Sequence, residues 1–291
     1  MKQENSKLKA YAELIRLDKP IGIYLLLWPT LWALIIAADG QHDFTIISVF
    51  IVGVILMRSA GCAINDFADR HFDGHVERTQ HRPIISGRVS ASEALWIFII
   101  LSFCAFLLAW LTLNKLTLSY AIVAVALAAS YPFAKRYHYF PQVHLGCAFA
   151  WAIPMAFVAY TNAHPPLIAW VLFATNLLWT TAYDTMYGIS DREHDLKIGV
   201  KSTAILFAAA DRLIIGLLQL SSWLLLFIIG QQLSLHNSYF ISLGGIALLF
   251  IYQQNLIKHH HPKQCLKAFL NNHYVGMLVF IGLFISLQMN F

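Results

Sequence analysis

Residues 44–64 read FTIISVFIVGVILMRSAGCAI, a stretch of 21 residues whose one charged side chain is Arg58. A polar segment that holds Asp66, Asp69 and Asp73 follows directly. An α-helix needs about 20 predominantly apolar residues to cross the hydrocarbon core of a bilayer. This stretch therefore predicts a membrane-spanning helix that ends in a row of acidic side chains.

Apolar stretches of the same kind fill most of the chain. The intervals long enough for one span are Pro20–Ala38, Ala94–Asn114, Leu116–Ala134 and Ala268–Phe291. Two longer uncharged intervals, residues 137–183 and 213–257, must each turn back once, at 161–166 and 231–238. Together the intervals predict nine transmembrane helices. Continuous apolar runs lack the period-two alternation of a transmembrane β-barrel, which excludes that class.

The composition also indicates a membrane protein. Hydrophobic residues make up 58% of the chain and charged residues 12%, whereas an ordinary soluble domain has about 25% charged residues. A soluble globule so poor in charge could not cover its surface with polar side chains. The fold class is therefore an all-α polytopic membrane protein, with residues 1–291 as one domain. The four cysteines lack zinc-ligand spacing and imply no disulfide framework.

The basic residues predict the direction of the spans. Eighteen of the 20 Lys and Arg residues fall on the side shared with the N-terminus, while Lys115 lies on the other side and Arg58 within a span. Because cytoplasmic loops are enriched in Lys and Arg, we expect a cytoplasmic N-terminus and a C-terminus on the opposite side. The net charge of +5 is then mainly a topology signal and does not indicate nucleic-acid binding. Pro20–Ala38 is too long for a signal-peptide core, so we expect a retained first helix.

The acidic residues are concentrated in two clusters. Eight of the 15 Asp and Glu residues lie within residues 66–77 and 184–195. Both clusters contain a D-R-x-x-D pattern, at residues 69–73 and 191–195, and each follows a long apolar helix. This placement predicts two related four-helix halves, at about 20–135 and 141–257, and a ninth helix at about 268–291.

The spacing within each cluster indicates metal chemistry. The first row comprises Asn65 at its edge, Asp66, Asp69 and Asp73, and the second comprises Asp184, Asp191 and Asp195. On a continued helix, residues with these spacings share a face. Two facing rows of carboxylates would repel unless they held cations, and oxygen ligands of this kind suit Mg²⁺. Since Mg²⁺ commonly completes its shell with phosphate oxygens, the rows predict a diphosphate bridged by Mg²⁺.

Basic residues on the same side could complement the phosphate charge. They are Arg78, Arg82, Lys135, Arg136, Lys197 and Lys201. The simpler explanation is a solvated basic loop, and we prefer it for Arg88, Arg212, Glu77 and Glu193. The same explanation applies to the histidines at 259–261.

Arg58 stands apart from the loop residues because it lies within a span. An arginine at a helix centre costs ~2.5–3.5 kcal/mol on the insertion scale, and intramembrane charges usually face the bundle interior. We therefore expect Arg58 to bind an anionic group, such as a carboxylate, at the floor of a cavity. The alternative is a snorkelling or structurally paired arginine.

These motifs resemble those of a known family. Asn65–Asp69 followed by Asp73 resembles the N-D-x-x-D-x-x-x-D motif of the UbiA superfamily of intramembrane aromatic prenyltransferases. Residues 183–203 resemble its second motif, and residues 16–22 and 131–137 resemble supporting stretches. The similarity runs nearly end to end and is closest to the bacterial 4-hydroxybenzoate polyprenyltransferases of ubiquinone biosynthesis.

The resemblance implies nine helices around a central cavity, short cytoplasmic cap helices, and a place in the bacterial inner membrane. It implies Mg²⁺-dependent transfer of a long polyprenyl group from its diphosphate to the ring carbon ortho to the hydroxyl of 4-hydroxybenzoate. Both acidic rows would hold the metal, with Asp69, Asp73, Asp191 and Asp195 as catalytic residues. The implied diphosphate contacts are Arg78, Arg82, Tyr131, Lys135 and Lys201, and Arg58 would hold the benzoate carboxylate. The partners would be the two substrates and the bilayer, with no nucleic acid and no obligatory protein partner.

Other functions stay open at this point. The acceptor could be another aromatic compound, a haem or a chlorin, because the diphosphate site would be shared. A phosphatidyl-type transferase also pairs aspartates with Mg²⁺, but residues 73–78 fit its motif only in half. A cation transporter would need carboxylates near the bilayer midplane, whereas these carboxylates lie at one face of the membrane. The ring proton could leave to an aspartate of the second row or to the diphosphate.

Overall fold

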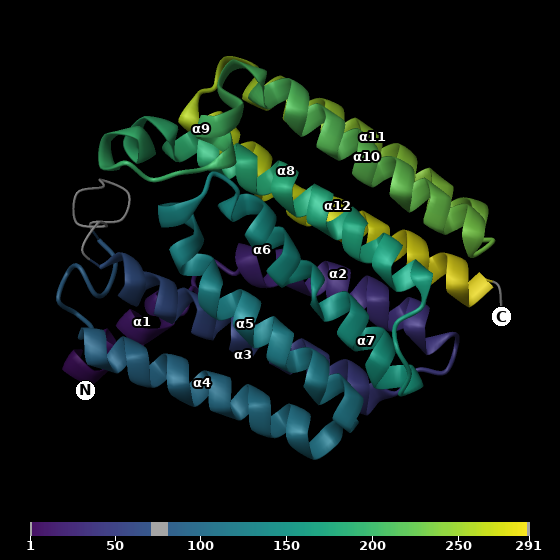
Figure 1. Ribbon diagram of the computed structural model, residues 1–291, viewed down its shortest axis with the longest axis horizontal. Helices are drawn as coiled ribbons and strands as arrows, with labels where there is room; N and C mark the ends of the chain where they lie inside the picture. The colour runs from purple at the N-terminus through teal and green to yellow at the C-terminus, as the bar shows by residue number, and fades with distance from the viewer. Residues whose placement is uncertain (1, 71–80, 290–291) are drawn as a thin grey trace.

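The computed structural model describes residues 2–70 and 81–289 and contains helices and no strands within those ranges. The helices are α1 (Lys2–Leu14), α2 (Ile21–Ala38), α3 (Phe44–Asp69), α4 (Ala91–Thr112), α5 (Lys115–Tyr137), α6 (Pro141–Ala150), α7 (Ala152–Thr161), α8 (Leu167–Ile198), α9 (Thr203–Phe207), α10 (Asp211–Gln232), α11 (Asn237–Leu256) and α12 (Pro262–Met289), with 3₁₀ turns η2 (Ala208–Ala210) and η3 (Ile257–His259). The long helices run side by side, and the two termini lie at opposite ends of the bundle (Figure 1). The all-α prediction is confirmed.

Eight stretches of the described chain are long and apolar enough to cross a bilayer. They are α2, α3, α4, α5, α6 with α7, α9 with α10, α11 with η3, and α12. The one predicted span missing from this set is α8, which at 32 residues is the longest described helix. Its sequence has Asn176, Thr180 and Asp184 at positions where the other spans are mostly apolar, so its hydropathy is lower. The protein is thus an integral membrane protein with eight apolar spans and one more polar central helix.

The two predicted reversals are where the sequence placed them. α7 ends at Thr161 and α8 begins at Leu167, and α10 ends at Gln232 before α11 begins at Asn237. One span has an additional break, at Trp151 between α6 and α7. Pro154 has no N–H to donate to the carbonyl four residues earlier, which explains why the helix is interrupted there.

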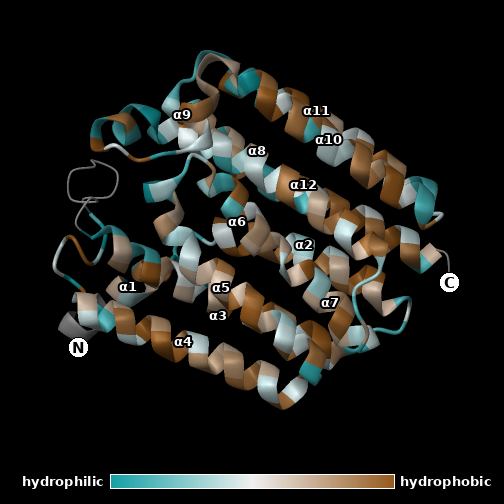
Figure 2. Cartoon of the chain, viewed as in Figure 1, coloured by the Kyte–Doolittle hydropathy of each residue, from teal (hydrophilic) through white to brown (hydrophobic). Residues whose placement is uncertain are grey.

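Local capping explains several helix starts. Asp43 accepts hydrogen bonds from the backbone N–H groups at the start of α3, Ser90 forms a capping box with Glu93 at the start of α4, and Asn114 caps α5. Such side chains satisfy N–H groups that have no partner within the helix. Helix α4 then presents large apolar side chains on its outer surface, including Trp96, Ile100, Phe103 and Trp110. The helix is largely brown, and so mostly hydrophobic, in Figure 2. Lipid is the solvent that suits this surface.

Two helices continue past their apolar spans, as the acidic spacing requires. α3 extends to Asp69 and α8 to Ile198. The predicted cap helices are present only in part: α9 and η2 follow the second acidic row, whereas residues 81–90 form turns and residues 71–80 lie outside the described chain. The structure adds α1, a helix in what the sequence suggested was only an N-terminal arm. The internal repeat stays a prediction.

Polar contacts join the central helices α2, α8 and α12. The indole of Trp179 on α8 donates to Asn272 Oδ1 on α12 at 2.8 Å, and the indole of Trp32 on α2 donates to the backbone carbonyl of Gly276 at 3.0 Å. A Cβ added at Gly276 would lie 2.6 Å from Cδ1 of Trp28. Trp28 is itself tied to α12, because its indole donates to His273 Nδ1 at 3.0 Å. The missing side chain at position 276 lets α2 and α12 approach closely.

We predict that Gly276→Ala lowers the free energy of unfolding by about 1–2 kcal/mol, because overpacking a tight contact outweighs the gain in helix propensity. Thermal unfolding in detergent, followed by tryptophan fluorescence, measures this. Gly244→Ala in α11 is the control, since a Cβ there meets nothing within 4 Å. Equal melting temperatures for the two variants would contradict the tight contact.

Candidate functional site

A large cavity lies among the long helices, with a volume of about 2100 Å³. Its lining includes every described residue of the site that the resemblance implies: Arg58, Asn65, Asp66, Asp69, Arg82, Tyr131, Lys135, Asp184, Asp191, Asp195 and Lys201. Of the two other basic candidates, Arg136 lines the cavity and Lys197 does not. Two further predicted residues, Asp73 and Arg78, lie outside the described residues. The fold therefore brings residues from α3, α5, α8 and the connecting loops to one cavity.

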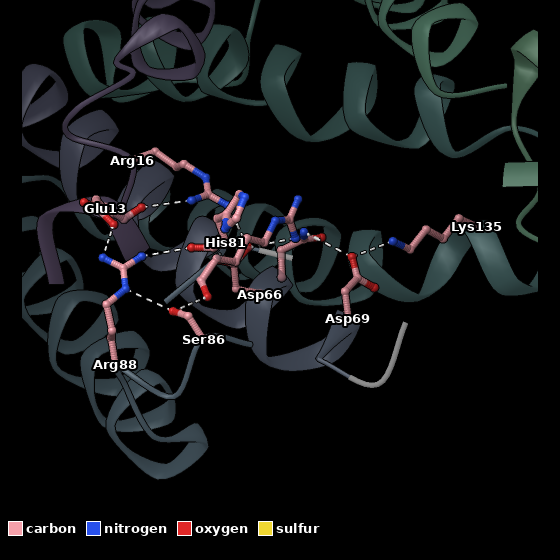
Figure 3. Close-up of polar contacts among 10 residues, drawn as sticks. Glu13, Arg16, Asp66, Asp69, His81, Ser86, Arg88 and Lys135 are labelled. Carbon is pink, nitrogen blue, oxygen red and sulfur yellow. Dashed lines mark hydrogen bonds and ion pairs between the residues drawn. The ribbon is translucent and has the colours of Figure 1, made fainter. Parts of the chain in front are cut away.

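The first acidic row lies on the last turns of α3. Asp66 is only 2% exposed, and its carboxylate is held by two arginines from different segments. Nη2 of Arg16 lies 3.0 and 3.1 Å from the two oxygens of Asp66, and Nη1 of Arg82 lies 3.0 Å from Oδ1. Figure 3 shows Arg16 reaching Asp66 from the segment that follows α1. A carboxylate buried this deeply requires such cations.

Asp69 has a different basic partner. Nζ of Lys135, in the last turn of α5, lies 2.5 Å from Oδ2 of Asp69 (Figure 3). The amide of Asn65 donates to the same oxygen at 3.3 Å. The other oxygen, Oδ1, is buried and has no hydrogen-bond partner. Buried acceptors are normally satisfied, so this oxygen is a point where a ligand could bind.

The second acidic row lies on one long helix. Asp184, Asp191 and Asp195 all belong to α8 and line the cavity. The helix ends at Gly199, whose left-handed backbone (φ 70°) turns the chain, with its N–H bonded to the carbonyl of Asp195. The chain then returns to the basic end of α5, where the N–H of Lys201 donates to the carbonyl of Lys135 at 3.0 Å.

Arg58 lies in the same cavity, within the span of α3. Its guanidinium lies over the ring of Phe149 at 5.8 Å and beside Gly22, where an added Cβ would be 2.4 Å from Nε. Nε is buried without a hydrogen-bond partner. A side chain at position 22 would therefore require the guanidinium of Arg58 to shift, and Arg58 has a donor left for an anion.

The described residues contain no group of three or more His, Cys, Asp or Glu side chains arranged to hold a metal ion. Basic side chains occupy positions beside Asp66 and Asp69 instead. The side chains still provide ligand atoms that fit Mg²⁺, which prefers carboxylate oxygens and leaves coordination positions for water and phosphate. The unpartnered oxygen of Asp69 is a ligand atom of that kind.

Arg16 lines the cavity and was absent from the predicted site. Arg16 was known only as part of a stretch that supported the resemblance, and its contact with Asp66 was not expected. The sequence analysis places Arg16 and Asp66 at the same end of the membrane spans, and this shared location was the signal in the sequence that the two side chains could meet. Arg88, assigned to a solvated loop, pairs with Glu13 at 2.5 Å. Its contact joins α1 to the loop before α4.

Comparison with known proteins gives a consistent result. The sequence pattern of the UbiA prenyltransferase family matches residues 26–284. A protein of Vibrio vulnificus named 4-hydroxybenzoate octaprenyltransferase is 55% identical over 280 residues, covering 96% of this chain and 98% of that protein. One of the same name from Photobacterium profundum is 53% identical, covering 98% of each chain.

Solved structures share the fold. The apo structure of a UbiA homolog from Aeropyrum pernix superposes with a TM-score of 0.80 at 24% identity, covering 90% of this chain and 97% of that one. A UbiA homolog from Archaeoglobus fulgidus, solved with GPP and Mg²⁺, gives a TM-score of 0.74 at 15% identity, covering 96% and 99%. At these identities the likeness concerns the fold alone.

The pair of Lys135 and Asp69 yields a stability prediction. Lys135→Met should lower the free energy of unfolding by about 1–3 kcal/mol, because the buried carboxylate loses its cation. Thermal unfolding of the ligand-free protein in detergent measures the loss. Asp69→Asn/Lys135→Met should recover most of it, and Lys197→Met, at an exposed position, should have no effect. A single variant as stable as the double variant would show that the charge pair is unimportant.

Proposed function

This chain belongs to the UbiA prenyltransferase family, and we propose that it transfers a polyprenyl group from polyprenyl diphosphate to 4-hydroxybenzoate. It is a prenyltransferase that attaches the chain to the ring carbon ortho to the hydroxyl. The products are 3-polyprenyl-4-hydroxybenzoate and diphosphate, a step of ubiquinone biosynthesis. The observation that carries this conclusion is the 53–55% identity, over nearly the whole chain, to proteins named 4-hydroxybenzoate octaprenyltransferase.

The reaction breaks the bond between the allylic carbon and the diphosphate oxygen, so charge develops on the leaving diphosphate. Mg²⁺, which we place between the two acidic rows, would supply positive charge at the departing oxygens. The metal set we propose is Asn65, Asp66, Asp69, Asp73, Asp184, Asp191 and Asp195. The cavity position of the described members and the unpartnered oxygen of Asp69 support this set.

Basic residues of the cavity would bind the diphosphate directly. The proposed set is Arg78, Arg82, Tyr131, Lys135 and Lys201, and the contact of Arg16 with Asp66 adds Arg16 to it. Arg16, Arg82 and Lys135 neutralise the first acidic row. If Mg²⁺ were held by those carboxylates, the same three cations would be available for phosphate oxygens. Such groups stabilise the leaving diphosphate because their charges are already in place.

Arg58 is the proposed site for the carboxylate of 4-hydroxybenzoate. Its unpartnered Nε and its place within α3, about two to three turns before the first acidic row, support that role. An anion held there would place the ring between Arg58 and the departing diphosphate. The cavity wall also contains apolar residues such as Phe98, Phe106 and Val125, which suit an isoprenoid chain. Excluding water also protects the allylic cation from hydrolysis.

We place the protein in the bacterial inner membrane, with the N-terminus and both acidic rows on the cytoplasmic side and the C-terminus on the other. The distribution of Lys and Arg supports this orientation, and the termini do lie at opposite ends of the bundle (Figure 1). Water-soluble 4-hydroxybenzoate would enter from the cytoplasm and the polyprenyl diphosphate from the bilayer. No nucleic acid and no obligatory protein partner is required.

The central test uses purified protein with Mg²⁺, 4-hydroxybenzoate and prenyl diphosphates of several lengths. We expect prenylated product, its loss on chelation with EDTA and its return on adding Mg²⁺. Asp69→Ala and Asp191→Ala should each reduce kcat/KM by at least about 100-fold, the size of effect seen when one transition-state stabilising group is lost. Full activity in both variants would contradict the two-row metal site.

Arg58 provides a separate test of the acceptor. Arg58→Leu should raise KM for 4-hydroxybenzoate about 10- to 100-fold, since a hydrogen bond to a charged group contributes about 1.5–3 kcal/mol. The KM for prenyl diphosphate should stay the same. With 4-hydroxybenzamide, which has no carboxylate, wild type and variant should differ far less. Unchanged acceptor kinetics would exclude Arg58 from this role.

A further inference from the structure

Arg192 belongs to the second acidic motif but does not line the cavity. Asp191 and Asp195, on either side of it in sequence, both do. The guanidinium of Arg192 instead pairs with the carboxylate of Asp211, the first residue of α10. Asp211 is fully buried, whereas Arg192 retains 21% side-chain exposure. The contact therefore joins the end of α8 to the start of α10, outside the cavity that the acidic row lines.

The surroundings of Asp211 explain why Arg192 stays there. Nε2 of His260, in the turn before α12, lies 2.9 Å from Oδ1 of Asp211. Below this contact, buried apolar residues of α8, α10 and α12, among them Met186, Ile215 and Cys265, form a separate core cluster. A carboxylate in such a place is strongly destabilising without its cation. Asp211 thus has a strong requirement for the charge of Arg192.

Without Asp211, Arg192 would have another carboxylate close by. Asp195 lies three residues further along α8, and residues at i and i+3 are neighbours on a helix surface. An arginine paired with Asp195 would carry its charge into the second acidic row. It would then compete there with a divalent cation, whose binding depends on the same carboxylate oxygens.

The first acidic motif has a comparable arrangement. Arg70, at the equivalent position of its D-R-x-x-D pattern, is also absent from the cavity lining. Its Nη1 donates to the carbonyl of Phe67 at 2.6 Å, and its guanidinium lies 4.2 Å from the centre of the Phe67 ring. Each motif thus has an arginine beside its aspartates, and in each the guanidinium is bound outside the cavity.

We propose that Asp211 is a positioning residue for the second acidic row: it binds Arg192 outside the cavity and so prevents that arginine from competing with a divalent cation at Asp195. The inference rests on the proposed function, because the cation site is part of it. Asp211 lies outside the reacting groups and acts only through Arg192. Replacing Asp211 should therefore weaken cation binding, and removing Arg192 as well should restore it.

The experiment measures metal binding without turnover. Mn²⁺ is titrated into the purified full chain in detergent, with a non-reactive prenyl thiodiphosphate present, and bound metal is followed by electron paramagnetic resonance. Asp211→Asn should raise the half-saturating Mn²⁺ concentration about two- to fivefold, the effect of one competing ion pair. Arg192→Gln/Asp211→Asn should return it to the wild-type value. Thermal unfolding of each variant checks that it is folded.

Glu193→Gln is the matched control, because it removes one negative charge from the same turn at an exposed position. It should leave the half-saturating concentration unchanged. If Asp211→Asn does not fold, Arg192→Lys/Asp211→Ser and Arg192→Gln/Asp211→Ser give the same comparison, and only the lysine variant should bind Mn²⁺ weakly.

The outcomes separate this inference from the proposed function. Wild-type protein that binds no Mn²⁺ would overturn the proposed metal site, and this inference with it. Wild-type binding together with an unchanged Asp211→Asn would overturn only the role of Asp211. A double variant that binds as weakly as Asp211→Asn would also overturn it, because the defect would then be structural.

Discussion

Carboxylates can be kept at the end of a lipid-embedded helix bundle only when cations neutralise them there. Asp66, 2% exposed, lies between Arg16 and Arg82, and Asp69 is paired with Lys135. An isolated buried carboxylate would be strongly disfavoured. The ends of α3 and α5 and the segment after α1 are therefore joined by charge pairs as well as by apolar contacts.

In the proposed function, the same charge pairs would connect stability to catalysis. The basic residues that neutralise the first acidic row would bind diphosphate once Mg²⁺ held the carboxylates. The cavity would thus exchange one set of charge partners for another without leaving a buried charge alone. Nearly all of these charges lie at one end of a protein that is otherwise apolar, with 12% charged residues in all.

Polar and close contacts at the centre of the bundle support this site. Helices α2, α8 and α12 are joined by indole hydrogen bonds from Trp32 and Trp179 and by the close approach at Gly276. Helix α8 has buried polar residues along its span, such as Asn176 and Thr180, and the second acidic row at its C-terminal end. It therefore links the core of the bundle to the candidate site. Its lower hydropathy follows from that position.

Much of this protein could be predicted from its sequence. Apolar stretches such as residues 44–64 determined the helical membrane fold, because length and hydropathy alone decide whether a helix can span a bilayer. The reversals near 161–166 and 231–238 followed from the same constraint. The helical spacing of Asp66 with Asp69, and of Asp191 with Asp195, placed each pair on one face, since side chains three or four apart are neighbours on any helix.

Only the tertiary structure decided which charges meet. Arg16 and Asp66 are 50 residues apart, Lys135 and Asp69 are 66 apart, and His260 and Asp211 are 49 apart. No local period relates such positions, so their pairing depends on how the helices pack. The helix at α1 and the direction of Arg192 away from the cavity were likewise not predicted. Each results from contacts between segments, which a periodic pattern along one segment does not contain.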